Sequence, residues 1–308
     1  MTDPDRPVDP SGQSPVNPGA AGTRRTDGSA GDADYARIGT GYTTYRRPEP
    51  IFMAAIEAAL GTAVTVLNVG AGAGSYEPVD RQVTAVEPSA TMRQQRPPHL
   101  SVAVDATAEH LPFGDDTFDA AMATFTVHQW PDLAAGLAEV RRVTRGPVLV
   151  LTCDPAVLEA SWLNRYAPEV IATEARRYPP IEDIQRLLAA PAGHRHTGAQ
   201  VQGQVQVQAV EIPWGCVDGF SEAYYGRPEL LLDPGARQAN SAWSLVGPDV
   251  EQRFEQTLRA DLDSGAWDRE FGQLRRQPFF DGALRLVVGH PASSEDAAAG
   301  DACPEGVG

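Results

Sequence analysis

Three glycines at alternate positions are the residues whose spacing most clearly suits ligand chemistry. Gly70, Gly72 and Gly74 follow the apolar run Val64–Val69, which predicts a buried strand of a parallel sheet. Glycine tolerates a positive φ and lets a ligand lie against bare backbone. Such a turn, at the carboxyl end of a strand in an open α/β sheet, is the usual site for a nucleotide-like cofactor. We therefore expect this turn, including Ala71, to contact a cofactor.

Acidic residues follow the next two predicted strands. Glu87 comes directly after the strand Gln82–Val86, and its carboxylate is suited to accept hydrogen bonds from two ribose hydroxyls. Asp105 ends the predicted strand Leu100–Val104 and is placed to accept from an adenine amino group, with the backbone N–H of Ala106 beside it. Because parallel strands end at one edge of a sheet, we expect these residues to share a crevice with the glycine turn.

The order of these motifs resembles the cofactor domain of class I S-adenosylmethionine (SAM)-dependent methyltransferases. The nearest branch is the small-molecule one that includes the ubiquinone and menaquinone biosynthesis enzymes, and the resemblance covers residues 64–151. The matching segments are Val66–Gly74 as motif I, Val86–Ser89 as the ribose acid, Asp105–Ala106 with Glu109 and Leu111–Phe113 as the adenine motif, Phe118–Asp119 through His128–Trp130, and Glu139–Val143. The resemblance implies SAM as the cofactor and methyl transfer to an oxygen, nitrogen or carbon atom of a small molecule.

Together, the motifs and the resemblance indicate a set of cofactor-binding residues. These are Tyr42, Arg46, Asn68, Gly70, Ala71, Gly72, Gly74, Glu87, Pro88, Ser89, Met92, Asp105, Ala106 and Phe125. Met92 and Phe113 are near enough in sequence to enclose the purine. Asn68 stands where the family usually has an acidic residue, so it can hold the loop by hydrogen bonds but carries no charge to meet the SAM ammonium.

His128 is the candidate catalytic residue. It ends the predicted strand Phe118–Val127, beside the expected position of the methyl group, and a hydroxyl acceptor would need such a base. The alternative is that His128 packs against the cofactor or hydrogen-bonds to the backbone. His194 and His196 are expected in an exposed loop.

The segment Tyr35–Pro48 is rich in tyrosine and arginine and is predicted to form a lid over the cofactor. The planar fork of Arg46 or Arg47 suits the cofactor carboxylate. Closing the lid would shield the sulfonium from water and complete the acceptor pocket. The alternative is that its tyrosines simply pack on the predicted helix Ile51–Leu60.

Two other functions remain open at this point. An NAD(P)-dependent oxidoreductase would use the spacing G-x-G-x-x-G, but Ser75 occupies the place of the third glycine, and the pair Asp105–Ala106 also argues against it. A SAM-binding protein with a non-methylating activity would have the same cofactor site. A nucleic-acid methyltransferase is disfavoured because Thr126–Trp130 lacks the Asn/Asp-Pro-Pro-Tyr/Phe motif.

Strands alternate with helical patterns up to Leu151, which predicts a parallel α/β sheet. The resemblance implies a Rossmann-like, seven-stranded, mostly parallel sheet with helices on both faces. Val205–Ile212 and Ala283–Val288 would supply strands six and seven, the last one antiparallel. The expected organisation is a disordered tail (1–33), lid segment and first helix (34–62), SAM-binding domain (63–216), inserted helical cap (217–280), final strand (281–291) and disordered tail (292–308).

The composition of the chain limits the classes of molecule that it is expected to bind. The 308-residue chain has a formal net charge of −16, which disfavours binding to nucleic acid phosphates or an anionic membrane. It has no run of 18 apolar residues and no signal-peptide pattern, and three widely spaced cysteines indicate neither disulfides nor a metal site. We therefore expect a cytoplasmic protein with a small-molecule substrate and no metal. The sequence leaves its oligomeric state open.

Overall fold

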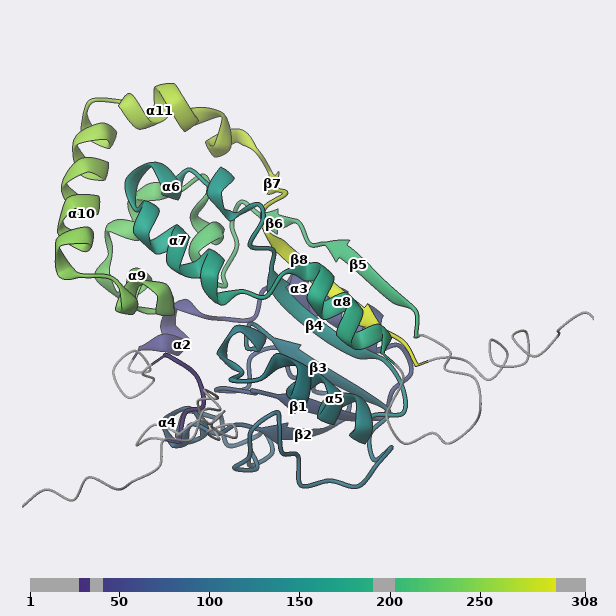
Figure 1. Cartoon of the computed structure of the whole chain (residues 1–308). Helices are drawn as coiled ribbons and strands as arrows, with labels where there is room; N and C mark the ends of the chain where they lie inside the picture. Colours follow the sequence, from purple (N-terminus) through teal and green to yellow (C-terminus); the bar gives the residue numbers. More distant parts are fainter. Residues whose placement is uncertain (1–27, 34–40, 191–202, 292–308) are drawn as a thin grey trace, which may run out of the picture.

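The computed structural model describes residues 28–33, 41–190 and 203–291. Its central sheet has the strand order β2-β1-β3-β4-β8-β5 (Figure 1). The strands are β1 Thr65–Val69, β2 Gln82–Val86, β3 Ala120–Thr124, β4 Val148–Cys153, β5 Val205–Ala209 and β8 Leu284–Gly289. The first four strands run parallel, and β8 is antiparallel to both β4 and β5. This confirms the predicted Rossmann-like, mostly parallel sheet with its final antiparallel strand.

Within the described residues the sheet has six strands, so the expectation of seven needs correction. The segment Leu100–Val104 makes only a single bridge, between Val104 and Val86. The carbonyl oxygen of Ser101 accepts hydrogen bonds from the Arg96 guanidinium, and the Ser101 hydroxyl donates to the carbonyl of Val83 at 3.0 Å. These side-chain bonds replace the backbone pairing that a strand would make at this edge.

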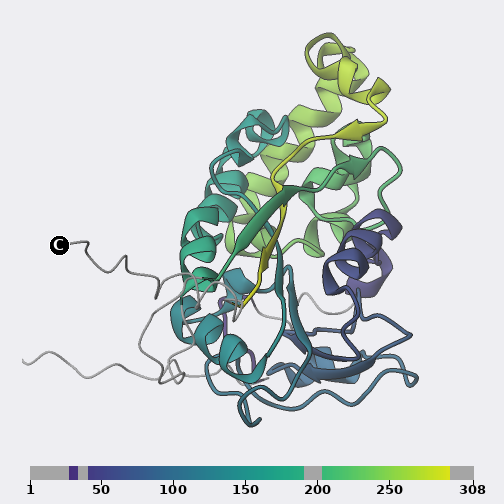
Figure 2. The same cartoon turned by 90° about the vertical axis from the view of Figure 1, so that its right-hand side faces the viewer.

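Helices cover both faces of the sheet (Figure 2). Helix α3 (Pro50–Leu60) lies on one face, where it packs against alternate strand residues such as Val66 and Met122. Helices α5 (Leu133–Val143) and α8 (Ile181–Ala189) pack on the other face against residues such as Leu67 and Ala121. Side chains alternate along a strand, so a strand that is apolar throughout must be covered on both sides.

The remaining helices are short or belong to the region beyond β4. The α-helices are α2 Tyr42–Tyr45, α4 Ala90–Gln94, α6 Leu163–Tyr166, α7 Pro168–Arg177, α9 Pro234–Gln238, α10 Pro248–Asp263 and α11 Ala266–Phe271. The 3-10 helices are η1 Val127–Gln129, η2 Leu158–Ala160, η3 Ser221–Tyr224, η4 Pro228–Leu232, η5 Ser241–Leu245 and η6 Gly272–Arg276. A small second sheet pairs β6 (Ile212–Pro213) with β7 (Phe279–Phe280). No described helix is long and apolar enough to cross a membrane.

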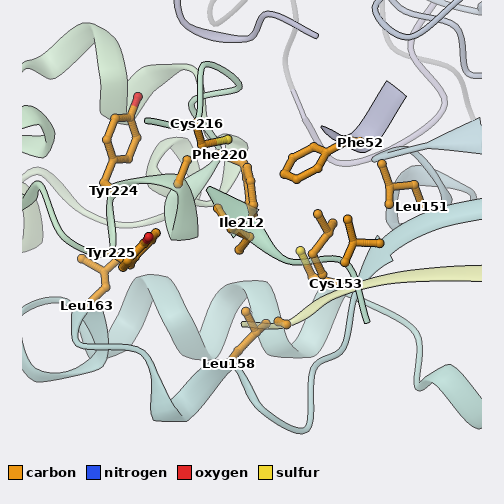
Figure 3. Close-up of a cluster of buried hydrophobic side chains, with 14 of the residues drawn as sticks. Phe52, Leu151, Cys153, Leu158, Leu163, Ile212, Cys216, Phe220, Tyr224 and Tyr225 are labelled. Atoms are coloured by element: carbon orange, nitrogen blue, oxygen red, sulfur yellow. The ribbon is translucent and has the colours of Figure 1, made fainter. Parts of the chain in front are cut away.

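We call residues 158–177 and 217–276 the helical region. This region and the sheet share one hydrophobic core. Trp243 and Trp267 are fully buried inside the helical region, as ordinary core residues. Figure 3 shows the junction, where Phe52 of α3 and Cys153 of β4 lie near Phe220 of the helical region. Because this junction is apolar and continuous, the helical region is held against the end of the sheet where β4 finishes.

Residues 28–33 differ from the expectation of a disordered tail. Ser29 is only 2% exposed and Ala33 is fully buried. The Ala33 N–H donates to the side-chain oxygen of Gln129 at 3.3 Å. We call residues 28–33 the N-terminal strap. Residues 1–27 and 292–308, the remainder of the two expected tails, lie outside the described residues.

Candidate active site

A pocket with about 900 Å³ of space, partly open to solvent, lies where β1, β2 and β3 end. Most of the predicted cofactor-binding residues line it. They are Tyr42, Arg46, Gly70, Ala71, Gly72, Glu87, Pro88, Met92, Ala106 and Phe125. We call it the glycine-loop pocket.

The glycine turn is fixed to the neighbouring strand by its backbone. The N–H groups of Gly70 and Ala71 both donate to the carbonyl oxygen of Val86 at 2.9 Å. Gly70 has φ +68°, and a Cβ at this position would overlap the side chain of Thr126. A side chain is therefore excluded by both conformation and space, which leaves bare backbone along the wall of the pocket.

Glu87 lies in the pocket wall with its carboxylate already oriented. One oxygen accepts from the N–H of Gly72 at 2.8 Å and the other from the N–H of Ser89 at 2.7 Å. Burial raises the pKa of Glu87, and these two N–H groups oppose the rise. A buried carboxylate in this place is suited to accept hydrogen bonds from ligand hydroxyls.

Asn68 supports the loop from behind and does not line the pocket. Its side-chain N–H donates to Glu77 at 3.0 Å, and Glu77 forms a two-point ion pair with Arg96 at 2.9 Å. The side-chain oxygen of Asn68 is buried without a partner among the described residues. This cluster anchors the short connection between β1 and β2, which contains no helix.

Three other predicted residues lie outside the pocket wall. Ser89 caps α4 by accepting from the N–H of Met92 at 3.3 Å. Gly74 packs against Leu100, where a Cβ would overlap that side chain. Asp105 is half-exposed and pairs with Arg93 at 3.2 Å. Phe113, the proposed partner of Met92 around the purine, packs instead against Phe118, with ring centroids 5.0 Å apart.

The pocket wall contains strained backbone. Tyr76 (φ +66°) and Phe125 (φ +52°) are two of the three non-glycine residues with positive φ in the described chain, and both line the pocket. Such conformations cost energy and concentrate at functional sites. The Phe125 ring contacts Arg46, whose guanidinium carbon lies 5.0 Å from the ring centroid.

The described part of the lid segment is docked on the helical region. Arg46 forms an ion pair with Asp218, and the Tyr76 hydroxyl donates to the same carboxylate at 2.7 Å. The carbonyl of Tyr45 accepts from the N–H of Gly219 at 2.8 Å, and the Tyr45 hydroxyl donates to Asp233 at 2.7 Å. Residues 34–40, including Tyr35, lie outside the described residues.

Several pocket residues were not among the predicted cofactor contacts, although a few of them belong to the matching motifs. They are Ser29, Ala30, Gly31, Ala73, Ser75, Tyr76, Thr107, Ala108, Glu109, Thr124, Thr126, Gln129, Trp130, Pro131 and Asp218. Those near the glycine turn, the adenine motif and the end of β3 are adjacent to predicted contacts, so a wider window would have included them. The strap residues and Asp218 belong to segments with no recognisable motif.

A second pocket, of about 550 Å³, adjoins the first and shares Tyr42, Arg46 and Phe125 with it. We call it the adjoining pocket. Residues from β4, α7 and η3 line its far side, among them Cys153, Glu174 and Glu222. Burial raises the pKa of the Cys153 thiol well above its usual value, so this thiol stays protonated.

His128 lies in the adjoining pocket, where it packs against Tyr178 with ring centroids 4.5 Å apart. It belongs to η1, the 3-10 turn that follows β3. Its Nδ1 atom is buried without a partner among the described residues. Burial holds the pKa of His128 well below its usual range, and the positive charges of Arg177 and Arg46 lower it further. The ring is therefore neutral near pH 7. His194 and His196 lie outside the described residues.

Comparison with known proteins identifies the class. Residues 67–150 match the family model for a methyltransferase domain. No curated protein is significantly similar in sequence. A structure from Anabaena variabilis, described as a methyltransferase from an antibiotic biosynthesis pathway, is 27% identical, with a TM-score of 0.71 over 80% of this chain and 98% of that one.

Weaker similarity extends to other methyltransferase structures. A SAM-dependent methyltransferase from Thermotoga maritima, described as a possible histamine N-methyltransferase, is 16% identical, covering 83% of this chain and 96% of that one at a TM-score of 0.45. A plantazolicin methyltransferase is 11% identical, covering 85% and 92% at a TM-score of 0.49.

Residues 67–150 therefore form a methyltransferase domain, and the chain has the class I fold of SAM-dependent methyltransferases. By domain and fold, this chain is a SAM-dependent methyltransferase.

Proposed function

We propose that this enzyme transfers a methyl group from SAM, bound in the glycine-loop pocket, to a small-molecule acceptor bound in the adjoining pocket. The observation that carries this proposal is the shared wall. Tyr42, Arg46 and Phe125 line both pockets, so two ligands would meet across these three residues.

The residues of the glycine-loop pocket fit SAM. Glu87 would take the ribose hydroxyls, because its buried carboxylate faces the space beside the bare backbone of Gly72. Met92 and Ala106 would contact the adenine, and they lie in the same wall. When bound, SAM supplies an activated methyl group, so the protein's task is to align an acceptor atom and exclude water.

The residues that the two pockets share would serve that alignment. Arg46 is held by its ion pair with Asp218 and by its contact with the Phe125 ring, so it would keep a fixed position beside both ligands. We propose that His128 positions the acceptor through a hydrogen bond. With its pKa lowered by burial, His128 is a weaker base than an ordinary histidine.

An untargeted methylation assay tests the proposal. The protein is incubated with a metabolite extract and SAM carrying a deuterated methyl group, and products are found by mass spectrometry. We expect a metabolite that gains one labelled methyl group with the wild type and much less with Glu87→Ala. A labelled product that forms equally with both proteins, or nicotinamide oxidation without methyl transfer, would contradict it.

A further inference from the structure

We infer that the adjoining pocket selects a molecule that carries a basic nitrogen, which Glu174 and Glu222 hold as an ammonium group. This inference rests on the proposed function, because it takes the adjoining pocket as the acceptor site. The proposed function names only a small-molecule acceptor, and this inference specifies its chemical class.

Two buried carboxyl groups in the pocket wall carry the argument. Glu174, on α7, is 9% exposed and accepts from the Ser221 hydroxyl at 3.1 Å. Glu222, on η3, is 4% exposed and accepts from the N–H of Ala283 at 2.8 Å. In the described chain, neither makes an ion pair with a basic side chain. A buried carboxylate is costly unless a cation compensates it, so a cationic ligand would supply what the protein lacks.

The two arginines in the same wall are already paired with other carboxylates. Arg46 pairs with Asp218, on the side of the glycine-loop pocket. Arg177 makes two hydrogen bonds of 2.7 Å to Asp32 of the N-terminal strap and one of 3.0 Å to Ser241. With both guanidinium groups paired, the two glutamates supply the remaining carboxyl groups of the wall. Burial favours their protonated form, and a bound ammonium group would favour the charged form by compensating it. An anionic acceptor would meet these carboxyl groups with no free cation to receive it.

The rest of the wall also suits an ammonium group. Phe125 and Phe220 pack with ring centroids 5.4 Å apart, and Tyr178 lies beside His128. Aromatic faces attract cations, especially where water is excluded. The unpartnered Nδ1 of neutral His128 is a further hydrogen-bond acceptor in the described wall. Carboxyl groups, ring faces and a neutral imidazole all favour a ligand that donates hydrogen bonds and carries positive charge.

Binding of three matched probes tests this inference on the full chain saturated with S-adenosylhomocysteine (SAH), the demethylated form of SAM. The probes are phenethylamine, 2-phenylethanol and phenylacetate, which share an aromatic ring and differ in charge. Ligand-observed NMR titration gives their affinities. We expect the amine to bind at least about tenfold more tightly than the alcohol, as a hydrogen-bonded charge pair would produce, and phenylacetate to bind most weakly.

Charge-removing variants locate the effect. Glu174→Gln and Glu222→Gln should each weaken phenethylamine binding by about tenfold and leave 2-phenylethanol unchanged. Glu169→Gln is the matched control, because Glu169 is also on α7 but is half-exposed and pairs with Arg253. It should change neither affinity. Circular dichroism checks that each variant is folded. Because the two test variants change different residues, the inference can still be tested if one of them fails to fold.

Three outcomes would overturn the inference: no binding of the amine, equal or tighter binding of the alcohol or phenylacetate, or unchanged amine affinity in folded Glu174→Gln and Glu222→Gln. Titration with SAH alone is performed first. If SAH does not bind, the proposed function fails. If SAH binds and the amine preference is absent, only the present inference fails.

Discussion

At the scale of single residues, Gly70 and Gly72 offer a matched comparison. Both have positive φ, +68° and +52°, but a Cβ on Gly70 would overlap Thr126, whereas on Gly72 it would meet only the terminal methyl of Met92 at 3.4 Å. We expect Gly70→Ala to lower stability by more than the roughly 1–2 kcal/mol that the left-handed conformation costs alanine, and Gly72→Ala to lose about that amount. Chemical denaturation measures both. Equal losses would contradict the steric account of Gly70.

Glu222 makes a pH-dependent contribution to stability. Burial raises its pKa to about 7, with Glu174 and Asp281 adding to the rise while the Ala283 N–H and Arg285 oppose it. The folded protein therefore keeps a proton that the unfolded chain has released. The stability contributed by this protonated carboxyl is complete below about pH 4.5 and is lost as the pH rises to about 7.

We therefore expect Glu222→Gln to flatten the stability curve. Between pH 4.5 and about 7, wild type should lose up to about 3 kcal/mol relative to the variant, as measured by denaturant titration at each pH. Glu169→Gln serves as the control with wild-type behaviour. Parallel curves for wild type and Glu222→Gln would show that Glu222 titrates normally.

At the scale of elements, the N-terminal strap is a segment whose contacts with the site the sequence analysis did not predict. Its residues 29–31 line the glycine-loop pocket, and its Asp32 holds Arg177 in the adjoining pocket. We expect deletion of residues 1–33 to weaken SAH binding by roughly tenfold, because one wall of the site is lost. Deletion of residues 1–27 should leave the affinity unchanged. Calorimetric titration of both truncated proteins with SAH measures the two affinities. Equal affinities would show that the strap does not contribute to SAH binding.

The elements that the sequence predicted are those with a strong local pattern. β1 and β4 are rich in apolar residues and buried almost throughout, and α5 carries an apolar stripe that includes Leu137 and Val140. These local patterns identify the three elements. The expected strand Leu100–Val104 does not form a full strand, because hydrogen bonds from the side chains of Arg96 and Ser101 compete with backbone pairing to β2. Such side-chain competition is a tertiary effect that no local pattern shows.

The same reasoning explains the site. Gly70, Gly72 and Glu87 were found because a strand end and a glycine turn specify them within a short window. His128 was predicted beside the methyl group, and the structure places it on η1 in the wall of the adjoining pocket, so its catalytic role stays a prediction. Glu174, Glu222 and Asp218 converge from separate segments beyond β4, and their meeting depends on how the chain folds back on itself. That convergence could not be inferred from the sequence.

At the scale of the whole molecule, the sheet and the helical region share one core through Phe52, Leu151 and Phe220. We therefore expect a single cooperative unfolding transition, with coincident curves from tryptophan fluorescence and circular dichroism. Phe52→Ala should lower stability by about 3–5 kcal/mol and keep one transition, because it opens a cavity at the junction. Two separated transitions would show that the helical region is an independent domain.

The central claim is that the glycine-loop pocket binds SAM through Glu87, and calorimetric titration with SAH tests it most directly. We predict that wild type binds one SAH per chain and does not bind NADH. Glu87→Ala should bind SAH about tenfold to a hundredfold more weakly, because it removes charged hydrogen bonds in a buried wall. Asp105→Asn, whose side chain lies outside that wall, should change the affinity less. Binding of NADH without SAH, or undiminished SAH affinity in Glu87→Ala, would contradict the claim.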